Sequence, residues 1–436
     1  MTRASRLACA LAATFLVTPA LADARSDAAD AVLDTRYKLA LELVRHTPTY
    51  TPPVSSRTLA YLGIASYEAV ASGSAQMQSL AGQLNGLAAP PRRDPAQPYD
   101  DAVVLEATLA ALTHDFYGNT GPSGQRAMEA LDAKLGVTAA AGLSDDVVAR
   151  SVDYGEALSA YLFDWSKSDG GASIDNMGFP RSYALKTDPG AWAPTSKIVQ
   201  QQAPLLPDWG KNRPFAMPAG STCNLPPPPA YSEDKASQFY KEALEVYQTA
   251  QNLTDEQKSI ARFWADDAML TYTPPGHWIS ILNEIAEAKA VPLDQHVDAL
   301  ARLGITMADA FIGNWYVKYE YNMERPLTYL RKVIDPKFEP LINTPPFPEY
   351  PSGHSTQSAA AATVLTALFG ENFAFDDQTP TPDGSPQRSF KGFWDASNEA
   401  AISRLYAGIH FRAAIVQGQA QGRCIAAFTT ALKTLK

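Results

Sequence analysis

Beyond its first two dozen residues, the sequence lacks any apolar run of the roughly 20 residues needed to span a membrane. Internal repeats are absent, and no convincing alternation of polar and apolar residues predicts strands, so the expected class is all-α. The chain also lacks an excess of basic charge, because 36 Lys and Arg face 46 Asp and Glu for a net charge of −10. An acidic surface repels nucleic acid and anionic lipid, so neither is expected as a partner.

Residues 1–22 are typical of a secretory signal peptide. Two arginines precede an apolar stretch over residues 7–17, and the small residues Ala-Leu-Ala at 20–22 form a suitable cleavage site. A membrane anchor is the alternative, but the stretch is short and Pro19 interrupts it. We therefore expect an exported protein, periplasmic or secreted, with a mature chain of residues 23–436.

Cysteine is scarce in this chain. Of three cysteines, Cys9 would leave with the signal peptide, and Cys223 and Cys424 would remain. In an exported chain this even pair suits a disulfide, but two buried thiols suit the sequence equally well, and both interpretations stay open. Loss of the signal peptide also removes two arginines and no acid, so the net charge falls by two from −10. An anion site would therefore have to gather its cations locally.

The periodic segments of the chain are helical, and a hydrophobic content of 46% is sufficient for a large core. In residues 144–165, Ser144 can cap a helix whose apolar side chains recur every three or four positions. The same reasoning predicts helices over residues 28–46, 56–72, 101–114, 233–250, 255–270, 278–288, 294–321, 355–369, 395–407 and 411–434. We expect a single all-α domain.

Residues 168–231 are dense in glycine and proline and have no sustained period, which predicts a long irregular segment. Segments of this length in compact proteins are usually functional or cover the core. Trp192, Leu205, Leu206 and Trp209 indicate that this one wraps the helical bundle. A domain boundary is the alternative, and we prefer the single-domain interpretation.

Three short stretches near the C-terminus carry residue types that suit an anion. The stretches are KYEYNMERP, PSGHS and SRLYAGIH, and their polar residues are Lys318, Arg325, Ser352, Gly353, His354, Arg404 and His410. Lys318 and Arg325 are two helical turns apart, so both can lie on one helix face. Taken singly, each stretch has an ordinary explanation as a solvated helix face, a helix cap or a structural histidine.

Together, the three stretches supply three fixed cations, a hydroxyl, an unhindered backbone N–H at a helix start and two imidazoles. This inventory suits a tetrahedral oxyanion that becomes five-coordinate. The cations would balance its charge, and the arginines offer forked donors to its oxygens. The Ser352 hydroxyl and the Gly353 N–H would add hydrogen bonds. One histidine could bond the central atom while the other moves protons.

In order, spacing and residue type, these stretches resemble the signature of the phosphatidic-acid phosphatase type 2 and vanadium haloperoxidase superfamily. The stretches FWADDAMLTYTPPGHW (263–278), TPPFPEYPSGH (344–354) and TPPVSSRTLAYLGIASYEAV (51–70) are similar to its secreted bacterial haloperoxidase-like branch. The resemblance thus covers most of the mature chain, and bacterial iodide-oxidising members are the most similar in length and spacing. It implies a helical bundle around a vanadate cofactor, with the site motifs within residues 311–414.

The resemblance also implies a role for each site residue. Vanadate oxygens would be held by Lys318, Arg325, Ser352, Gly353 and Arg404. His410 would bond vanadium through a ring nitrogen, His354 would be the catalytic acid/base, and Lys318 would also polarise peroxide. The implied enzyme is a vanadium-dependent haloperoxidase that oxidises a halide with hydrogen peroxide to hypohalous acid or an equivalent species. The resemblance leaves open which halide is used, whether an organic substrate is halogenated, and the oligomeric state.

One position departs from the phosphatase pattern. Phosphatases carry an aspartate four residues after the nucleophilic histidine, whereas Ala414 stands there in this chain. A carboxylate that orients His410 is therefore missing locally, which weakens the alternative of a periplasmic acid phosphatase with a histidine nucleophile. A third interpretation, an oxyanion-binding protein without activity, would not need an acid/base histidine.

Two aspartates and the remaining histidines complete the candidates. Asp266 or Asp267 could supply a carboxylate near His354 or Arg404, or merely decorate a helix end. His277, in PPGHW, is a weaker candidate, for the entrance of the site. The histidines that we treat as structural are His46, His114 and His296, and the candidate neighbours of the halide are Tyr316 and Phe347.

Overall fold

A computed structural model describes residues 19–196, 201–380 and 384–435. Most of the predicted signal peptide lies outside the described residues. The helices are α1 (Pro19–His46), α2 (Pro52–Ala71), α3 (Asp101–Tyr117), α4 (Pro122–Ala140), α5 (Asp145–Ser166), α6 (Gln238–Gln251), α7 (Asp255–Phe263), α8 (Thr273–Lys289), α9 (Leu293–Tyr321), α10 (Pro326–Val333), α11 (Gly353–Phe369), α12 (Phe393–Tyr406) and α13 (Arg412–Thr430). Strands β1 (Phe375–Asp377) and β2 (Arg388–Phe390) form a short antiparallel hairpin.

The all-α prediction is confirmed, because the hairpin is the only sheet of the described chain. The helix predictions missed α4 and α10, and the predicted helix over residues 255–270 is too long. In the structure, α7 ends at Phe263. Asp266 and Met269 then adopt positive φ angles of 51° and 67°, which a right-handed helix does not accommodate. A loop rather than a helix therefore carries Asp266 and Asp267.

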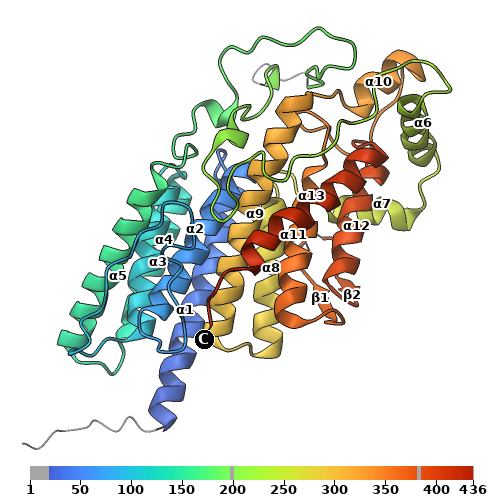
Figure 1. Cartoon of the computed structure of the whole chain (residues 1–436). Helices are drawn as coiled ribbons and strands as arrows, with labels where there is room; N and C mark the ends of the chain where they lie inside the picture. Colours follow the sequence, from blue (N-terminus) through green and yellow to red (C-terminus); the bar gives the residue numbers. More distant parts are fainter. Residues whose placement is uncertain (1–18, 197–200, 381–383, 436) are drawn as a thin grey trace, which may run out of the picture.

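Helices α2 and α9 pack along each other at the centre of the fold (Figure 1). Two glycines allow this close approach. A Cβ atom on Gly63 would lie 2.7 Å from the carbonyl oxygen of Leu300, and one on Gly304 would lie 2.9 Å from that of Leu59. Any larger residue would push the two backbones apart. The largest apolar cluster crosses this contact and extends from α1 to the segment after α13.

The described parts of residues 168–231 cover α9 and lie at the top of the view in Figure 1. Both carboxylate oxygens of Asp309 on α9 accept backbone N–H groups of Phe215, Ala216 and Met217, at 2.6–2.9 Å. The segment is therefore anchored to the central helix by hydrogen bonds. Its buried large residues include Trp192, Leu205 and Trp209, while Leu206 is half-buried.

A disulfide between Cys223 and Cys424 joins this segment to α13, 201 residues further along the chain. Of the two interpretations that the sequence left open, the structure shows the bonded one. Of the helices that the structure describes, none combines the length and the apolar character that crossing a membrane requires.

The C-terminal helices place the start of α11 beside the start of α13. Helix α11 packs against α9, α12 and α13. Just before α11, the Ser352 N–H donates to the Ala414 carbonyl at 3.0 Å. This contact brings the PSGHS stretch next to the segment that carries His410.

Candidate active site

The predicted anion-binding residues converge where the ends of several helices meet. Lys318 lies on α9, Arg325 precedes α10, Ser352, Gly353 and His354 open α11, Arg404 lies in the last turn of α12, and His410 precedes α13. Nη1 of Arg325 lies 3.0 Å from Nε2 of His410, and Nζ of Lys318 reaches the carbonyl just before Ser352. The charges of Arg404 and His354 also act on His410. The structure thus brings the three predicted stretches together.

The His410 ring is held in one tautomer by two partners. Its Nδ1 lies 2.8 Å from Oε1 of Glu349, and its Nε2 lies 3.0 Å from Nη1 of Arg325. Because a guanidinium can only donate, Nε2 carries a lone pair, and Nδ1 carries the proton that Glu349 accepts. Burial first, and then Arg325, Lys318 and Arg404, lower the pKa of His410 well below its usual value. The ring is therefore neutral and its Nε2 can bind a metal.

Glu349 supplies His410 with the orienting carboxylate that is missing locally in the sequence. The side chain of Ala414 is fully buried and apolar, and the carboxylate comes instead from Glu349, 61 residues before His410 in the chain. The same carboxylate oxygen accepts the backbone N–H of Phe411 at 2.8 Å. The sequence reasoning missed Glu349, although it stands in the quoted stretch TPPFPEYPSGH, because no spacing rule connects it with His410.

Lys318 donates to three backbone carbonyls of the loop over residues 348–351. An ammonium group has three protons, so these bonds use all its donors and hold the loop in front of α11. Burial first, and then the neighbouring Arg325, lower the pKa of Lys318 well below its usual value. Direct contact of Lys318 with an anion stays a prediction.

Arg325 and Arg404 are buried cations of the kind that bind anions. Arg325 donates from Nε to the Phe347 carbonyl and from Nη1 to the Ile409 carbonyl, but its buried Nη2 has no hydrogen-bond partner among the described residues. Burial lowers the pKa of Arg325 and of Arg404 to about 10 each. A desolvated donor without an acceptor costs free energy, which a bound anion would recover.

The start of α11 offers further donors. The hydroxyl oxygen of Ser352 caps the helix by accepting a backbone N–H. A Cβ atom on Gly353 would meet nothing closer than 3.9 Å, so no neighbouring protein atom requires glycine at this position. The open space allows an oxyanion to approach the N–H of Gly353 at the positive end of the helix. Gly353 and His354 are half-buried, unlike the fully buried cations, so the site opens on their side.

Asp266 faces His354. Its Oδ2 lies 3.4 Å from Nε2 of His354, within ion-pair distance, and neither buried atom has a hydrogen-bond partner in the described chain. Burial first, and then Arg404, lower the pKa of His354 to about 4, although Asp266 opposes the shift. Asp267 is half-buried, and its charge acts on Arg404. Of the two aspartates, Asp266 is therefore the one that lies at His354, and the charges of both act on Arg404.

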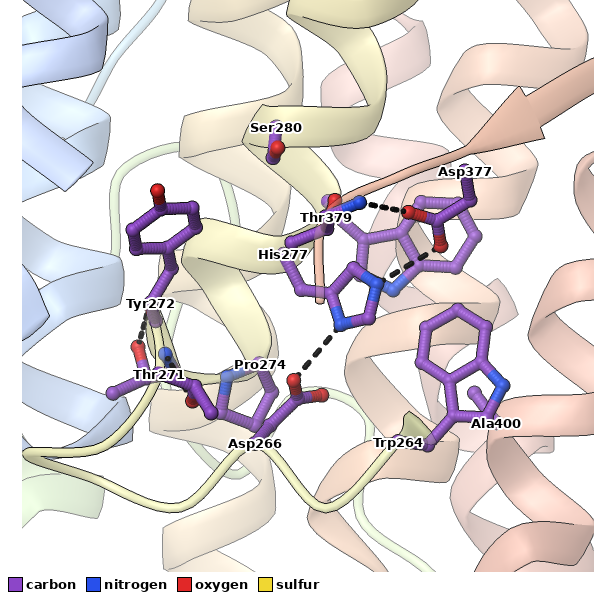
Figure 2. Close-up of polar contacts among 12 residues, drawn as sticks. Trp264, Asp266, Thr271, Tyr272, Pro274, His277, Ser280, Asp377, Thr379 and Ala400 are labelled. Carbon is purple, nitrogen blue, oxygen red and sulfur yellow. Dashed lines mark hydrogen bonds and ion pairs between the residues drawn. The ribbon is translucent and has the colours of Figure 1, made fainter. Parts of the chain in front are cut away.

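His277 does not line the entrance. The residue is 1% exposed and lies behind Asp266, between two carboxylates (Figure 2). Its Nδ1 is 2.8 Å from Oδ1 of Asp266, and its Nε2 is 2.9 Å from Oδ2 of Asp377. Burial favours the neutral ring, but the two carboxylates outweigh it and raise the pKa of His277 to about 10. Asp377 on β1 was missed, since no sequence signal connects it with His277.

Sequence comparisons agree with this site. A family model of the second helical-bundle domain of VCPO matches residues 298–434. The vanadium chloroperoxidase of Curvularia inaequalis is 27% identical over 227 residues, covering 38% of this chain and 36% of that protein. The vanadium-dependent bromoperoxidase of Ascophyllum nodosum is 37% identical over 94 residues, covering 19% of this chain and 17% of that protein. The matched regions thus span well under half of either relative.

Solved structures extend the likeness to nearly the whole chain. A bacterial vanadium-dependent iodoperoxidase superposes with a TM-score of 0.86 at 36% identity, covering 93% of this chain and 97% of that one. A holo-type bacterial vanadium-dependent chloroperoxidase, at 16% identity, shares the fold with a TM-score of 0.68, covering 89% and 93%. The chain therefore belongs to the vanadium haloperoxidase family, and the resemblance inferred from its motifs is confirmed.

Proposed function

We propose that this protein is a vanadium-dependent haloperoxidase that oxidises a halide with hydrogen peroxide to hypohalous acid or an equivalent species. The observation that carries the proposal is the His410 ring. Glu349 holds its Nδ1 proton, and its Nε2 lone pair lies beside the incompletely bonded guanidinium of Arg325. A neutral nitrogen ligand next to cationic donors suits an oxyanion whose central atom is a metal.

The residues at this site fit vanadate. His410 would bond the metal through Nε2, and Arg325, Arg404 and the N–H of Gly353 would donate to the oxygens. The hydroxyl oxygen of Ser352 accepts a backbone N–H, so its own proton can be donated to the same anion. Lys318 would add its charge. When bound, vanadate supplies a Lewis acid that activates peroxide for attack by halide.

His354 would act as the base. Its lowered pKa, about 4, keeps the ring neutral near neutral pH, so the ring can accept a proton from hydrogen peroxide. Asp266 would stabilise the imidazolium that forms, because its unpaired Oδ2 faces Nε2. In this proposal the protein handles the proton, and the halide and peroxide provide the redox change.

A second candidate reaction is phosphate monoester hydrolysis. The Glu349 carboxylate orients His410 as a phosphatase carboxylate would, so the argument from Ala414 no longer weighs against a histidine nucleophile. The haloperoxidase reaction remains the better supported, because the 36% identical iodoperoxidase matches nearly the whole chain.

One set of assays separates the two reactions. The mature chain is stripped of bound anions and assayed with peroxide and iodide, bromide or chloride, with and without orthovanadate, and with an aryl phosphate. We expect vanadate-dependent oxidation of at least one halide, and loss of vanadate retention in His410→Ala. Rapid hydrolysis of the aryl phosphate, inhibited by vanadate and without any halide oxidation, would instead identify a phosphatase.

We also propose that residues 1–22 are removed on export and that residues 23–436 work as one domain in the periplasm or outside the cell. The disulfide between Cys223 and Cys424 supports this location, because such bonds persist mainly in oxidising compartments. N-terminal sequencing of the protein recovered from cell fractions tests both the cleavage site and the compartment.

A further inference from the structure

Four ionisable side chains follow one another from β1 to the start of α11. In order, they are Asp377, His277, Asp266 and His354. Successive polar atoms are 2.9, 2.8 and 3.4 Å apart. The first three side chains are almost inaccessible to solvent, at 0%, 1% and 7% exposure. Figure 2 shows the first three side by side, with the histidine ring between the carboxylates.

The outer end of this chain of residues is held in place by further contacts. Oδ1 of Asp377 accepts the N–H of Thr379 at 3.0 Å. The His277 ring stacks on Trp264, with centroids 4.5 Å apart and planes inclined by 19°. Trp264 in turn donates its indole N–H to Glu399 at 3.0 Å. His277 therefore cannot rotate without losing two charged hydrogen bonds and a stacked ring.

His277 determines which carboxylate oxygen of Asp266 faces His354, the proposed base. His277 occupies Oδ1 of Asp266, so Oδ2 is the oxygen left to face His354. The cation between two carboxylates also lowers the repulsion between them, which otherwise favours protonation of one carboxylate. Asp266 is thereby kept as an oriented anion on the loop between α7 and α8.

We propose that His277 and Asp377 are positioning residues for His354 and act on it through Asp266. Asp377 fixes the ring of His277, His277 fixes the carboxylate plane of Asp266, and Asp266 orients the Nε2 side of the His354 ring, which leaves Nδ1 to accept the proton. The inference rests on the proposed function, because it assumes that His354 accepts a proton from peroxide. The inference adds His277 and Asp377 to the residues that determine turnover, although neither belongs to the predicted anion-binding set.

A purely structural role would have different consequences. His277 could serve only to fasten the loop over residues 264–272 to the β1–β2 hairpin. Its loss would then lower stability without a selective loss of turnover. The test must therefore separate kcat from folding and from cofactor binding.

The first measurement compares His277→Phe with His277→Asn in the vanadate-loaded enzyme. Phenylalanine keeps a ring against Trp264 but donates no proton, whereas asparagine can still donate to Asp266. We expect kcat to fall roughly 10–100-fold in His277→Phe and less in His277→Asn, with the KM for peroxide and the dissociation constant for vanadate unchanged. His296→Phe is the matched control, since His296 is a buried histidine hydrogen-bonded to Asn283 outside the site.

The second measurement is a double-mutant cycle. If His277 acts through Asp266, then His277→Phe should cause no further loss of kcat in an Asp266→Asn background. The inference would be overturned if the kcat losses of the two single variants multiplied in the double variant, or if kcat were unchanged in both His277 variants. A parallel loss of vanadate binding would overturn it as well. If the wild-type enzyme oxidises no halide, the proposed function itself fails, which is a distinct outcome.

A third measurement needs no vanadium and no turnover. In nitrogen-15-labelled vanadium-free protein, His277 should show two ring N–H protons protected from exchange, because both ring nitrogens donate to buried carboxylates. Asp377→Ala, which leaves no acceptor there, should remove the protection at Nε2 and keep that at Nδ1. Rapid exchange at both positions in the wild type would contradict the positioning role, even if the His277→Phe variant does not fold.

Discussion

Oε1 of Glu349 lies 2.8 Å from Nδ1 of His410, and both side chains are buried. This pair decides which ring nitrogen carries the proton and so which one can bind a metal. A carboxylate that precedes α11 thus orients His410, the predicted vanadium ligand, which precedes α13.

Glu349→Gln should weaken vanadate binding about 10–100-fold, because a neutral amide raises the basicity of the His410 ring less than a carboxylate does. Glu324→Gln is the control, since Glu324 is also buried but has no contact with His410. Calorimetric titration of the stripped variants with vanadate measures the effect. Equal vanadate affinities in the two variants would show that Glu349 has no effect on vanadate binding through His410.

His354→Ala should retain vanadate and lose turnover by roughly 10²–10⁴-fold, the contribution of a positioned acid/base group. Vanadate should be retained because the predicted bond to the metal comes from His410. Turnover should fall because His354, which contacts Asp266, is the proposed base. Vanadium content after dialysis and the initial rate with peroxide are measured on the same sample. A variant that turns over like the wild type across the pH range would refute the role of base.

The folding stability should decrease as the pH rises from about 6.5 towards about 10. The pKa of His277 is about 10 in the folded protein and about 6.5 in an unfolded chain, so its protonation stabilises the fold fully below the lower value and not above the higher one. The titratable groups that face His277 are Asp266, Asp377, Glu284 and His354.

Urea unfolding at a series of pH values measures this slope. In His277→Asn the decrease over the same pH range should be smaller, because the group that releases the proton is absent. If the free energy of unfolding fell equally with pH in the variant and the wild type, a group other than His277 would be responsible for the decrease.

Cys424→Ser should lower the free energy of unfolding by about 2–5 kcal/mol, as expected when a native disulfide that closes a long loop is removed. The bond with Cys223 also fastens the irregular segment to α13. Mass spectrometry of the unreduced, unfolded wild type should find no alkylatable thiol in the mature chain. Two alkylated cysteines would mean that the bond does not form.

Helices with a clear apolar stripe could be predicted from the sequence, and others could not. Only Met128, Leu135 and Ala139 of α4 are buried, so this helix has too few apolar contacts to produce a visible period. The three-residue strands of the hairpin are too short for any alternation to stand out. Helix α7 ends at Phe263, and Asp266 in the loop that follows contacts His277, which no sequence period indicates.

The convergence of the candidate anion-binding residues could be predicted, because their spacing in three stretches is itself the signal. Glu349 and Asp377 could not, since each acts on a histidine 61 or 100 residues away and only the tertiary fold brings them together. His277 was assigned to the entrance for the same reason. Its charge state depends on two carboxylates that the sequence does not place next to it.

The family-model match over residues 298–434 includes Lys318 and His410 and all the predicted anion-binding residues between them, but it begins after Asp266 and His277. The predicted cofactor-binding residues and the proposed base His354 thus lie within this one stretch, whereas Asp266 and His277, which are proposed to position that base, lie before it. Under the proposed mechanism, substitutions in residues 264–277 could adapt the enzyme to acidic or alkaline surroundings while the cofactor cradle stays unchanged. Natural selection could therefore adjust the working pH of such an enzyme independently of its vanadium requirement.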